Sequence, residues 1–321
     1  MSLEGGDFQT TFSRLKAAWG KAVKESFQDY GNWESVWVED GEVLEFSRRG
    51  KKNPQRLKMV DLQQLVKDLV HHLQLALEKL LPEGMELPDS QVHKFVANTH
   101  EEEEFFMDCQ SSMEIMAPLY QEFKDGHSTV TTISTTWLKK EQEFLHHLLA
   151  VLLVSGGVSP RTHLAQTCRI RGVERNIFHI LGSPVWISSL SKTNSVTRSS
   201  GGLWAFPPQV AWPLYYYLGV VRPFSIHLLQ LMGGQPNFDI LKSFLFVHTL
   251  TLEHTQRLWA RGDTKQVVEN SFASPLGLKL DCFDLRQILQ AVANRHLGGP
   301  SGNVYLYMQQ LTRFYSPTVY R

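Results

Sequence analysis

The chain has 321 residues, which is long for one small domain and short for three, so we expect two structural parts. Hydrophobic residues make up 42% of it and charged residues 20%, a globular composition that excludes an intrinsically disordered chain. Lys and Arg number 32, as do Asp and Glu, and the formal net charge of zero does not indicate a nucleic-acid or membrane partner. A local charged patch is compatible with this balance.

Three widely separated cysteines, Cys109, Cys168 and Cys282, argue against a disulfide framework and against a Cys-x-x-Cys zinc site. They predict buried thiols in a reducing compartment. The first residues lack the apolar stretch of a signal peptide. The longest apolar stretch, 144–154, is shorter than the roughly 20 residues that cross a bilayer. We therefore expect a soluble intracellular protein with no membrane partner.

The first 58 residues are mixed in character and end in a basic turn broken by Gly50 and Pro54. The turn carries six positive charges in eleven residues: Arg48, Arg49, Lys51, Lys52, Arg56 and Lys58. Such a cluster can contact phosphates, and it can equally be a solvated loop. The turn alone leaves both interpretations open.

A helix is predicted over residues 57–81, because leucines such as Leu62, Leu65, Leu69 and Leu73 recur at the spacing of one buried helical face. Residues 83–136 are more irregular, and the acidic run 101–104 is interpreted as solvated surface. The Thr- and Ser-rich stretch 128–136 is interpreted as a linker or capping segment before a helix that begins at Trp137. We place a domain boundary near the start of this Thr- and Ser-rich stretch, which divides the chain into residues 1–130 and 131–321.

The second part reads as helices around a small sheet. An apolar helix is expected at 137–154, a new helix opens at Ser159-Pro160, and two short strands within 176–188 flank the turn 182–184. An exposed strand is expected at 187–197. Further helices are expected at about 209–219, 225–232, 238–250 and 281–296. The predicted fold is mainly α-helical with a small antiparallel sheet (α+β), and the lack of βαβ alternation argues against a Rossmann or barrel fold.

Common catalytic and nucleotide-binding motifs are missing from the sequence, including a phosphate-binding P-loop, Gly-x-Gly-x-x-Gly, His-Glu-x-x-His and Gly-x-Ser-x-Gly. His248 and His254 are six residues apart, which does not match a metal-binding pair on one helical face. The expected protein therefore uses no metal and no cofactor.

Four residues of the second part, in chain order, are of the kinds that a phosphoryl-transfer site on DNA uses: Arg161, Lys192, Arg286 and Tyr320. Arginine clamps a scissile phosphate through two hydrogen bonds, lysine can protonate a leaving 5′-hydroxyl, and tyrosine can attack phosphorus. Such an order also arises by chance in a chain of this size. The alternative is that the arginines form structural ion pairs and the tyrosine has no catalytic role.

Local sequence around these residues adds a resemblance to a known family. The similar blocks are Gly-Gly-Val-Ser-Pro-Arg at 156–161, Arg-Ile-Arg at 169–171, Arg-Asn-Ile-Phe at 175–178, Leu-Ser-Lys-Thr-Asn-Ser-Val-Thr at 190–197, the segment from Pro207 to Val-Arg-Pro-Phe at 221–224, Leu-Arg-Gln-Ile at 285–288 and Asn-Arg-His-Leu at 294–297. In this order they resemble fungal mobile-element proteins of the crypton type and of the telomere-linked, RecQ-helicase-associated type. The resemblance covers about 137–297 and extends toward 320.

The resemblance implies a tyrosine-recombinase-like catalytic domain preceded by a helical domain that helps to clamp DNA. Arg161 would be the first catalytic arginine, Lys192 the hairpin lysine, Arg286 the second arginine and Tyr320 the nucleophile that forms a 3′-phosphotyrosine link. It implies a nuclear protein that acts on double-stranded DNA, as a homo-oligomer on that DNA. DNA contacts are expected from Arg48, Arg49, Lys51, Lys52, Arg169 and Arg171.

The chain departs from the family pattern at three positions. Leu164 stands where an acid is common, Phe283 where a histidine is common, and Leu311 where a histidine or tryptophan precedes the nucleophile by nine residues. Tyr305, nine residues after His296, is the alternative nucleophile, but it leaves only 305 − 286 = 19 residues after Arg286. We therefore prefer Tyr320.

Three functions remain open from the sequence. The chain is an active recombinase, a catalytically inactive DNA-binding or helicase-associated relic, or a helical protein-interaction module built on the helices at 57–81 and 137–154. The departures from the family pattern favour the second, because they remove hydrogen bonds to the reacting phosphate without removing DNA contacts.

Overall fold

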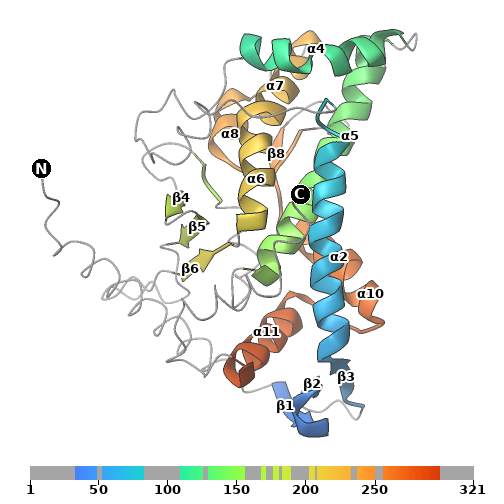
Figure 1. Ribbon diagram of the computed structural model, residues 1–321, viewed down its shortest axis with the longest axis vertical. Helices are drawn as coiled ribbons and strands as arrows, with labels where there is room; N and C mark the ends of the chain where they lie inside the picture. The colour runs from blue at the N-terminus through green and yellow to red at the C-terminus, as the bar shows by residue number, and fades with distance from the viewer. Residues whose placement is uncertain are drawn as a thin grey trace, which may run out of the picture.

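The computed structural model describes residues 33–48, 53–82, 109–125, 129–155, 168–170, 176–180, 183–188, 202–206, 208–232, 237–249 and 256–296. Within these ranges the protein is mostly helical, with two three-stranded antiparallel sheets and one two-stranded antiparallel pair (Figure 1). The expectation of a mainly helical α+β fold with small antiparallel sheets is confirmed.

The first sheet comes before the long N-terminal helix. It consists of β1 (Trp33–Val38), β2 (Val43–Arg48) and β3 (Gln55–Lys58), paired in chain order. The short 3₁₀ turn η2 (Glu39–Gly41) joins β1 to β2 with positive φ at all three residues. Sequence analysis did not predict these strands, because the expected contrast between apolar and polar residues is weak in β1, where three consecutive residues, 34–36, are exposed.

The predicted helix at 57–81 is confirmed as α2 (Met59–Glu78). It begins two residues later than expected because residues 55–58 pair with β2 instead. Its buried face includes Leu62, Leu65, Leu69 and Leu73, as the spacing predicted.

The longest helix is α5 (Val130–Ser155), and it begins earlier than the sequence suggested. Residues 130–136 were expected to be a linker or cap, but they form the first two turns of α5. Ile133 is buried one turn before Trp137, so burial of this face outweighs the weak helix propensity of the threonines. The cap lies just outside, where the Thr129 hydroxyl oxygen accepts a hydrogen bond from the Thr132 N–H at 3.2 Å.

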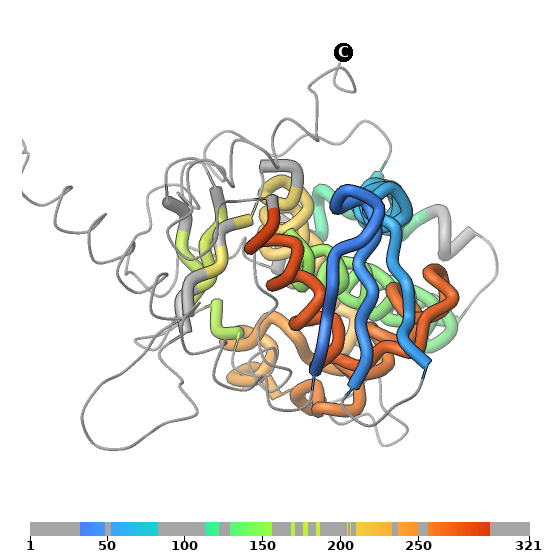
Figure 2. Tube along the Cα trace, turned by 90° about the horizontal axis from the view of Figure 1, so that it is seen from below, coloured from blue at the N-terminus to red at the C-terminus, as the bar shows by residue number. Residues whose placement is uncertain are grey.

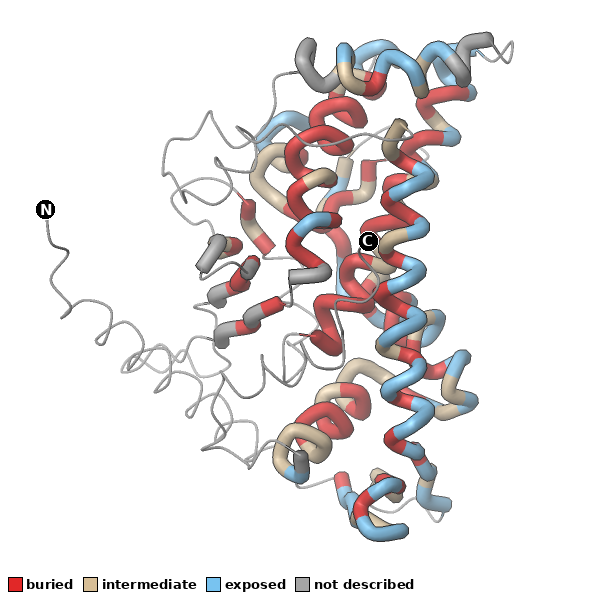
Figure 3. Tube along the Cα trace, in the orientation of Figure 1, coloured by how far each residue is buried: buried red, intermediate tan, exposed pale blue. Residues whose placement is uncertain are grey.

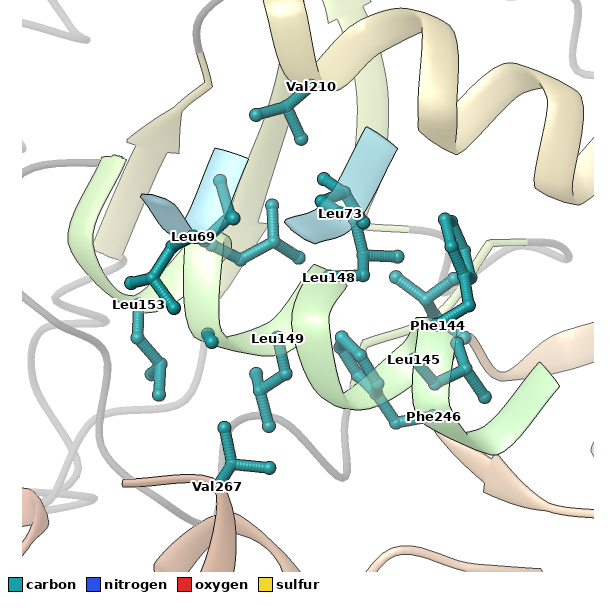
Figure 4. Close-up of a cluster of buried hydrophobic side chains, with 14 of the residues drawn as sticks. Leu69, Leu73, Phe144, Leu145, Leu148, Leu149, Leu153, Val210, Phe246 and Val267 are labelled. Carbon is teal, nitrogen blue, oxygen red and sulfur yellow. The ribbon is translucent and has the colours of Figure 1, made fainter. Parts of the chain in front are cut away.

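The core is built around α5. Its residues 148–155 are all buried, so the helix is apolar on every side at this end and must be surrounded. Figure 4 shows Leu148 and Leu149 between side chains of α2 and α6 on one side and Phe246 and Val267 on the other.

One continuous cluster of buried hydrophobic side chains runs from Trp33 in β1 to Leu289 near the end of the described chain. It includes α2 and α5, which pack together, and the predicted boundary between residues 130 and 131 falls within the first turn of α5. The domain boundary near residue 130 stays a prediction.

The second sheet confirms the two short strands expected within 176–188, but Ser183 and Pro184, which were expected in the turn, pair with Ile180 and His179. β4 (Ile177–Ile180) pairs with β5 (Ser183–Ser188), and β6 (Gly202–Ala205) pairs with the other side of β5. The exposed strand expected at 187–197 overlaps the end of β5, and its remainder lies outside the described residues.

The two helices expected at 209–219 and 225–232 are one continuous run. It consists of α6 (Pro208–Tyr216), a π-helical segment η4 (Tyr217–Val221) and α7 (Arg222–Leu231). Pro223 lacks an N–H donor but lies in the first turn of α7, where proline is tolerated, and the wider π turn directly precedes it.

The helix expected at 238–250 is too long. It ends at Ser243 as α8 (Phe238–Ser243), because Phe244 is extended and β7 (Val247–His248) pairs with β8 (Arg257–Leu258). The remaining helices include α4 (Cys109–Asp125), α9 (Arg261–Val268), the π segment η5 (Glu269–Ala273), α10 (Ser274–Leu276) and α11 (Cys282–His296), which confirms the helix expected at 281–296. Figure 3 shows that α4 and α2 each keep an exposed side.

No helix within the described ranges combines the length and the apolar character that a bilayer crossing requires. Cys168 is a buried free thiol, as expected, and its burial raises its pKa. Cys282 is a partly buried free thiol, and burial raises its pKa to about 11. The side chain of Cys109 lies outside the described residues.

Truncation of the core at α5 tests this architecture. Leu148→Ala should lower the free energy of unfolding by about 2–5 kcal/mol, because it opens a cavity where the side chain is fully buried. The control Leu75→Ala on α2 removes a side chain that is 39% exposed and should cost less than about 1 kcal/mol. Denaturant titration measures both, and equal losses would contradict the placement of α5.

Candidate functional site

The structure describes one of the four predicted catalytic residues. Arg286 lies on α11 and is partly buried. The other predicted catalytic residues, the alternative nucleophile and two of the departures lie outside the described residues: Arg161, Lys192, Tyr320, Tyr305, Leu164 and Leu311. Whether the four catalytic residues meet therefore stays a prediction.

The sequence places Lys192 in the segment 189–201, which connects β5 to β6. The two strands are antiparallel, and Ser188 pairs with Gly202 at the ends of this connection. Upstream of this sheet, residues 168–170 are tied to the chain after α8. The Ile170 N–H donates to the Ser243 carbonyl, and the Leu245 N–H donates to the Cys168 carbonyl, both at 2.9 Å.

The helix that carries Arg286 has a reciprocal cap at its start. The Asp281 Oδ1 atom accepts hydrogen bonds from the N–H groups of Phe283 at 2.9 Å and of Asp284 at 3.0 Å. In return, the Asp284 Oδ2 atom accepts one from the Asp281 N–H at 3.2 Å. This capping box satisfies N–H groups that the first helical turn leaves unpaired. Its negatively charged carboxylates are also attracted to the positive, N-terminal end of the helix dipole.

Arg48 at the end of β2 binds both carboxylates of this cap. Its Nε and Nη2 atoms donate to the two oxygens of Asp284 at 2.9 and 2.8 Å, and Nη2 lies 2.5 Å from Asp281 Oδ2. These bonds raise the pKa of Arg48. Burial opposes ionisation of Asp281, but the bonds from Arg48 and from backbone N–H groups outweigh it and lower the pKa of Asp281.

Phe283, where the family resemblance leads us to expect a histidine, packs against Arg48. The guanidinium of Arg48 lies over its ring, 5.8 Å from the centroid. This phenylalanine is therefore a packing partner of Arg48, and it offers no proton or hydrogen bond to a phosphate.

Two further contacts join the first sheet to the α11 region. The Gln55 side chain donates to the Lys279 carbonyl at 3.0 Å and accepts from the Lys279 N–H at 2.6 Å. At the far end of α11, the Arg295 Nη2 atom donates to the Asp40 carbonyl at 3.3 Å. Gly41 has φ of +95°, a conformation that favours glycine, and a Cβ there would lie 2.6 Å from Arg295 Nη2, so the arginine side chain would have to move. Figure 2 shows α11 running alongside β1 and β2.

Of the residues predicted to contact DNA, the structure describes only Arg48 and Arg169. Arg49, Lys51, Lys52 and Arg171 lie outside the described residues. The Arg169 guanidinium lies over the Phe244 ring at 4.8 Å, and its backbone N–H donates to the Asn176 side chain at 2.7 Å. DNA contact by Arg48 and Arg169 stays a prediction, although both side chains already make contacts within the protein.

A buried polar network that sequence reasoning missed lies next to α5. Glu141 and Arg222 are both fully buried, with Nε 3.4 Å from Oε1. Tyr217 donates to Glu141 at 2.9 Å and accepts from Arg222 Nε at 2.7 Å, while Thr249 donates to the other carboxylate oxygen at 3.1 Å.

Burial raises the pKa of Glu141, and attraction to Arg222 opposes that rise without cancelling it. Arg222 also donates to the carbonyls of Leu241 at 2.9 Å and Leu245 at 2.7 Å. Because no member of this network is exposed, it cannot contact a substrate. Its role is to connect α5, α7 and the end of α8.

A second unpredicted cluster surrounds Trp259. The rings of His248 and His146 lie 5.5 and 4.9 Å from its ring, and His248 Nε2 lies 3.0 Å from Asp263 Oδ1. Burial lowers the pKa of His248, and Asp263 offsets this only in part. Burial and repulsion from His248 lower the pKa of His146.

These shifts keep both imidazoles neutral at pH 7. The pairing of His248 with Asp263 spans fifteen residues, and no local spacing rule could have found it. Across the described ranges, no group of three His, Cys, Asp or Glu side chains could hold a metal ion.

Comparison of the chain with protein-family models, with characterised proteins and with solved structures finds no significant match.

Removal of one member of the buried ion pair should be strongly destabilising. We expect Arg222→Met to lower the free energy of unfolding by about 3–5 kcal/mol, because it leaves Glu141 buried without its partner. The control is Arg257→Met, which removes an arginine that is 50% exposed and paired with Asp263, and it should cost about 0–1 kcal/mol. Denaturant unfolding of both variants is the measurement, and a smaller loss for Arg222→Met would contradict the network.

The cap of α11 predicts a specific acid dependence. The folded-state pKa of Asp281 is depressed, so its stabilisation is present above its unfolded pKa of about 3.9 and is lost as pH falls through the lower folded value. At pH 6 the free energy of unfolding should therefore be larger for the native protein than for Asp281→Asn. This difference in free energy should shrink as the pH falls from about 4 to about 2. Unfolding titrations across this range measure it. A difference that stays constant from pH 6 to pH 2 would contradict the role of Asp281 in this cap.

Proposed function

We propose that the chain is a DNA-binding protein of the tyrosine-recombinase type and of mobile-element origin, which cleaves and rejoins DNA strands through a 3′-phosphotyrosine intermediate. The observation that carries the proposal is the antiparallel sheet β4–β5–β6, with Lys192 in the segment between β5 and β6. The family resemblance implies a lysine on a hairpin after the first arginine and before the second. The order of Arg161, this sheet and the helix of Arg286 agrees with that expectation.

The proposed residues supply a balanced reaction. The Tyr320 hydroxyl gives its proton to solvent while its oxygen attacks the scissile phosphorus. The bond from phosphorus to the 5′-oxygen breaks, and Lys192 gives a proton to that leaving oxygen. Arg161 and Arg286 hold the non-bridging oxygens while negative charge develops on them. Rejoining reverses these steps with a 5′-hydroxyl as the attacking group, so the reaction needs no metal and no cofactor.

The setting of Arg286 supports its proposed role. It lies in the second turn of a helix whose first turn is capped by Asp281 and held by Arg48. A phosphate clamp works best when its guanidinium is positioned before the substrate arrives, because little entropy is then lost on binding. A rigid helical start provides such positioning.

A second candidate function is DNA binding without cleavage. The observation that favours it is Phe283, an apolar side chain packed under Arg48 where the family commonly has a histidine. Loss of one transition-state hydrogen bond typically reduces a rate by a factor of about 10² or more. Phosphate contacts, which supply most of the affinity for DNA, do not depend on it. Under either function the partner is double-stranded DNA, bound by a homo-oligomer in the nucleus.

A covalent-adduct assay tests the proposal. Purified full-length protein is incubated with nicked duplexes of varied sequence, and protein–DNA adducts that survive denaturation by detergent are quantified. We expect an adduct with the native protein and none with Tyr320→Phe, because phenylalanine has no nucleophilic oxygen. Arg286→Ala should reduce the adduct by about 10² or more, since it removes a charged clamp on the phosphate.

Two matched variants serve as controls. Tyr305→Phe should leave the adduct intact if Tyr320 is the nucleophile, and Arg261→Ala removes an exposed arginine of α9 to which the proposal gives no role. An adduct that persists in Tyr320→Phe contradicts the assignment of the nucleophile. DNA binding that weakens with salt and forms no adduct favours the second function, and absence of both favours the helical interaction module.

A further inference from the structure

We propose that Arg48 is a positioning residue for Arg286: by holding Asp281 and Asp284, it fixes the first turn of α11 against the N-terminal sheet and so aims Arg286 at DNA. This inference rests on the proposed function. It gives Arg48 a role different from the direct DNA contact that the basic turn suggested.

Arg48 can restrict the orientation of Arg286 because the carboxylate that it binds lies close to Arg286 on the same helix. Asp284 and Arg286 are two residues apart, which is about 3 Å along a helix axis. The guanidinium of Arg48 binds Asp284 through two parallel hydrogen bonds and Asp281 through a third contact. A rotation or tilt of the first turn of α11 would break these contacts, so they restrict the direction in which Arg286 extends.

The other end of α11 is held by the same sheet. Arg295 donates to the Asp40 carbonyl, and its guanidinium lies against Gly41. Contacts at both ends of a helix resist tilting as well as rotation, whereas contacts at one end alone leave the other end free to swing. The sheet β1–β3 therefore holds α11 along its length, although 236 residues separate Arg48 from Asp284.

The chemistry requires arginine at this position. The planar guanidinium presents several N–H donors in a fixed geometry and can bind two carboxylates at once, whereas lysine offers a point charge on a flexible stem. Arg48 is 37% exposed, but the Asp284 side chain is only 7% exposed, so removal of Arg48 leaves a nearly buried carboxylate without its charged partner. Arg48 is therefore expected to contribute both to the stability of this junction and to the orientation of α11.

The test combines a structural and a functional readout on full-length protein. Arg48→Ala and Arg48→Lys are compared with Arg56→Ala, which removes an arginine from the same sheet whose partners are Glu39 and Glu45 rather than α11. Amide hydrogen exchange is followed over residues 281–296. The single-turnover rate of adduct formation is measured at saturating protein on the nicked duplexes, and DNA affinity is measured separately over a range of salt.

We expect Arg48→Ala to accelerate exchange in the first two turns of α11 and to slow adduct formation by about tenfold or more, with DNA affinity changed by less than about threefold. Arg48→Lys should recover part of the rate, and Arg56→Ala should leave it unchanged. In an Arg286→Ala background, Arg48→Ala should cause no further loss, because a residue that acts through Arg286 has nothing left to position.

Each other outcome overturns the inference. If the losses from Arg48→Ala and Arg286→Ala multiply, Arg48 acts independently of Arg286. If Arg48→Ala weakens DNA binding and lowers the salt slope by about one, Arg48 is a phosphate contact instead.

Failure of the proposed function would look different, because native protein would form no adduct at all. Hydrogen exchange then decides the inference alone. Faster exchange in the first turns of α11 for Arg48→Ala, but not for Arg56→Ala, would support Arg48 as the residue that holds this helix. Unchanged exchange in both variants would overturn it.

Discussion

The burial of α5 is the constraint on which the rest of the structure depends. A helix that is apolar on every side at one end cannot lie on a surface, so other elements must cover each of its faces. α2, α6 and α9 supply that cover, together with the segment around Phe246. The same helix carries Glu141 into the core, and a buried carboxylate needs a partner. Arg222 meets that need and, through its bonds to backbone carbonyls, ties α7 to the end of α8.

The polar contacts of the molecule divide into two kinds with different consequences. The network around Glu141 is closed to solvent and serves the fold alone. The contacts of Arg48 with the cap of α11 are partly exposed and join segments from opposite ends of the chain. They hold the N-terminal sheet against the first turn of α11 and so fix the direction of the helix that carries Arg286. The N-terminal sheet thus belongs to the proposed site although it contributes no proposed catalytic residue.

Sequence reasoning succeeded where one periodicity dominated and failed where distant segments decided the outcome. The leucine spacing of α2 and the apolar run of α5 identified both helices, because a repeat of 3–4 residues leaves few alternatives. The helix expected at 238–250 was wrong beyond Ser243, since pairing of β7 with β8 outweighs local propensity there. Strand β1 was missed because its inward and outward positions do not alternate clearly. The basic turn suggested phosphate contacts for Arg48, which stay a prediction, but nothing in the sequence indicated that this arginine binds Asp281 and Asp284.

By itself the sequence determined the class of the fold, the main helices, the hairpin of β4 and β5, and the residue types from which a DNA-cleavage site can be proposed. These follow from composition, periodicity and short-range turn chemistry, which act between neighbours in the chain. Only the tertiary structure decided which charges meet. Arg48 with Asp284, Glu141 with Arg222, and His248 with Asp263 are pairs that no spacing rule predicts. Folding brings such partners together because buried or half-buried charges are costly unless paired, and that cost depends on position in space rather than in sequence.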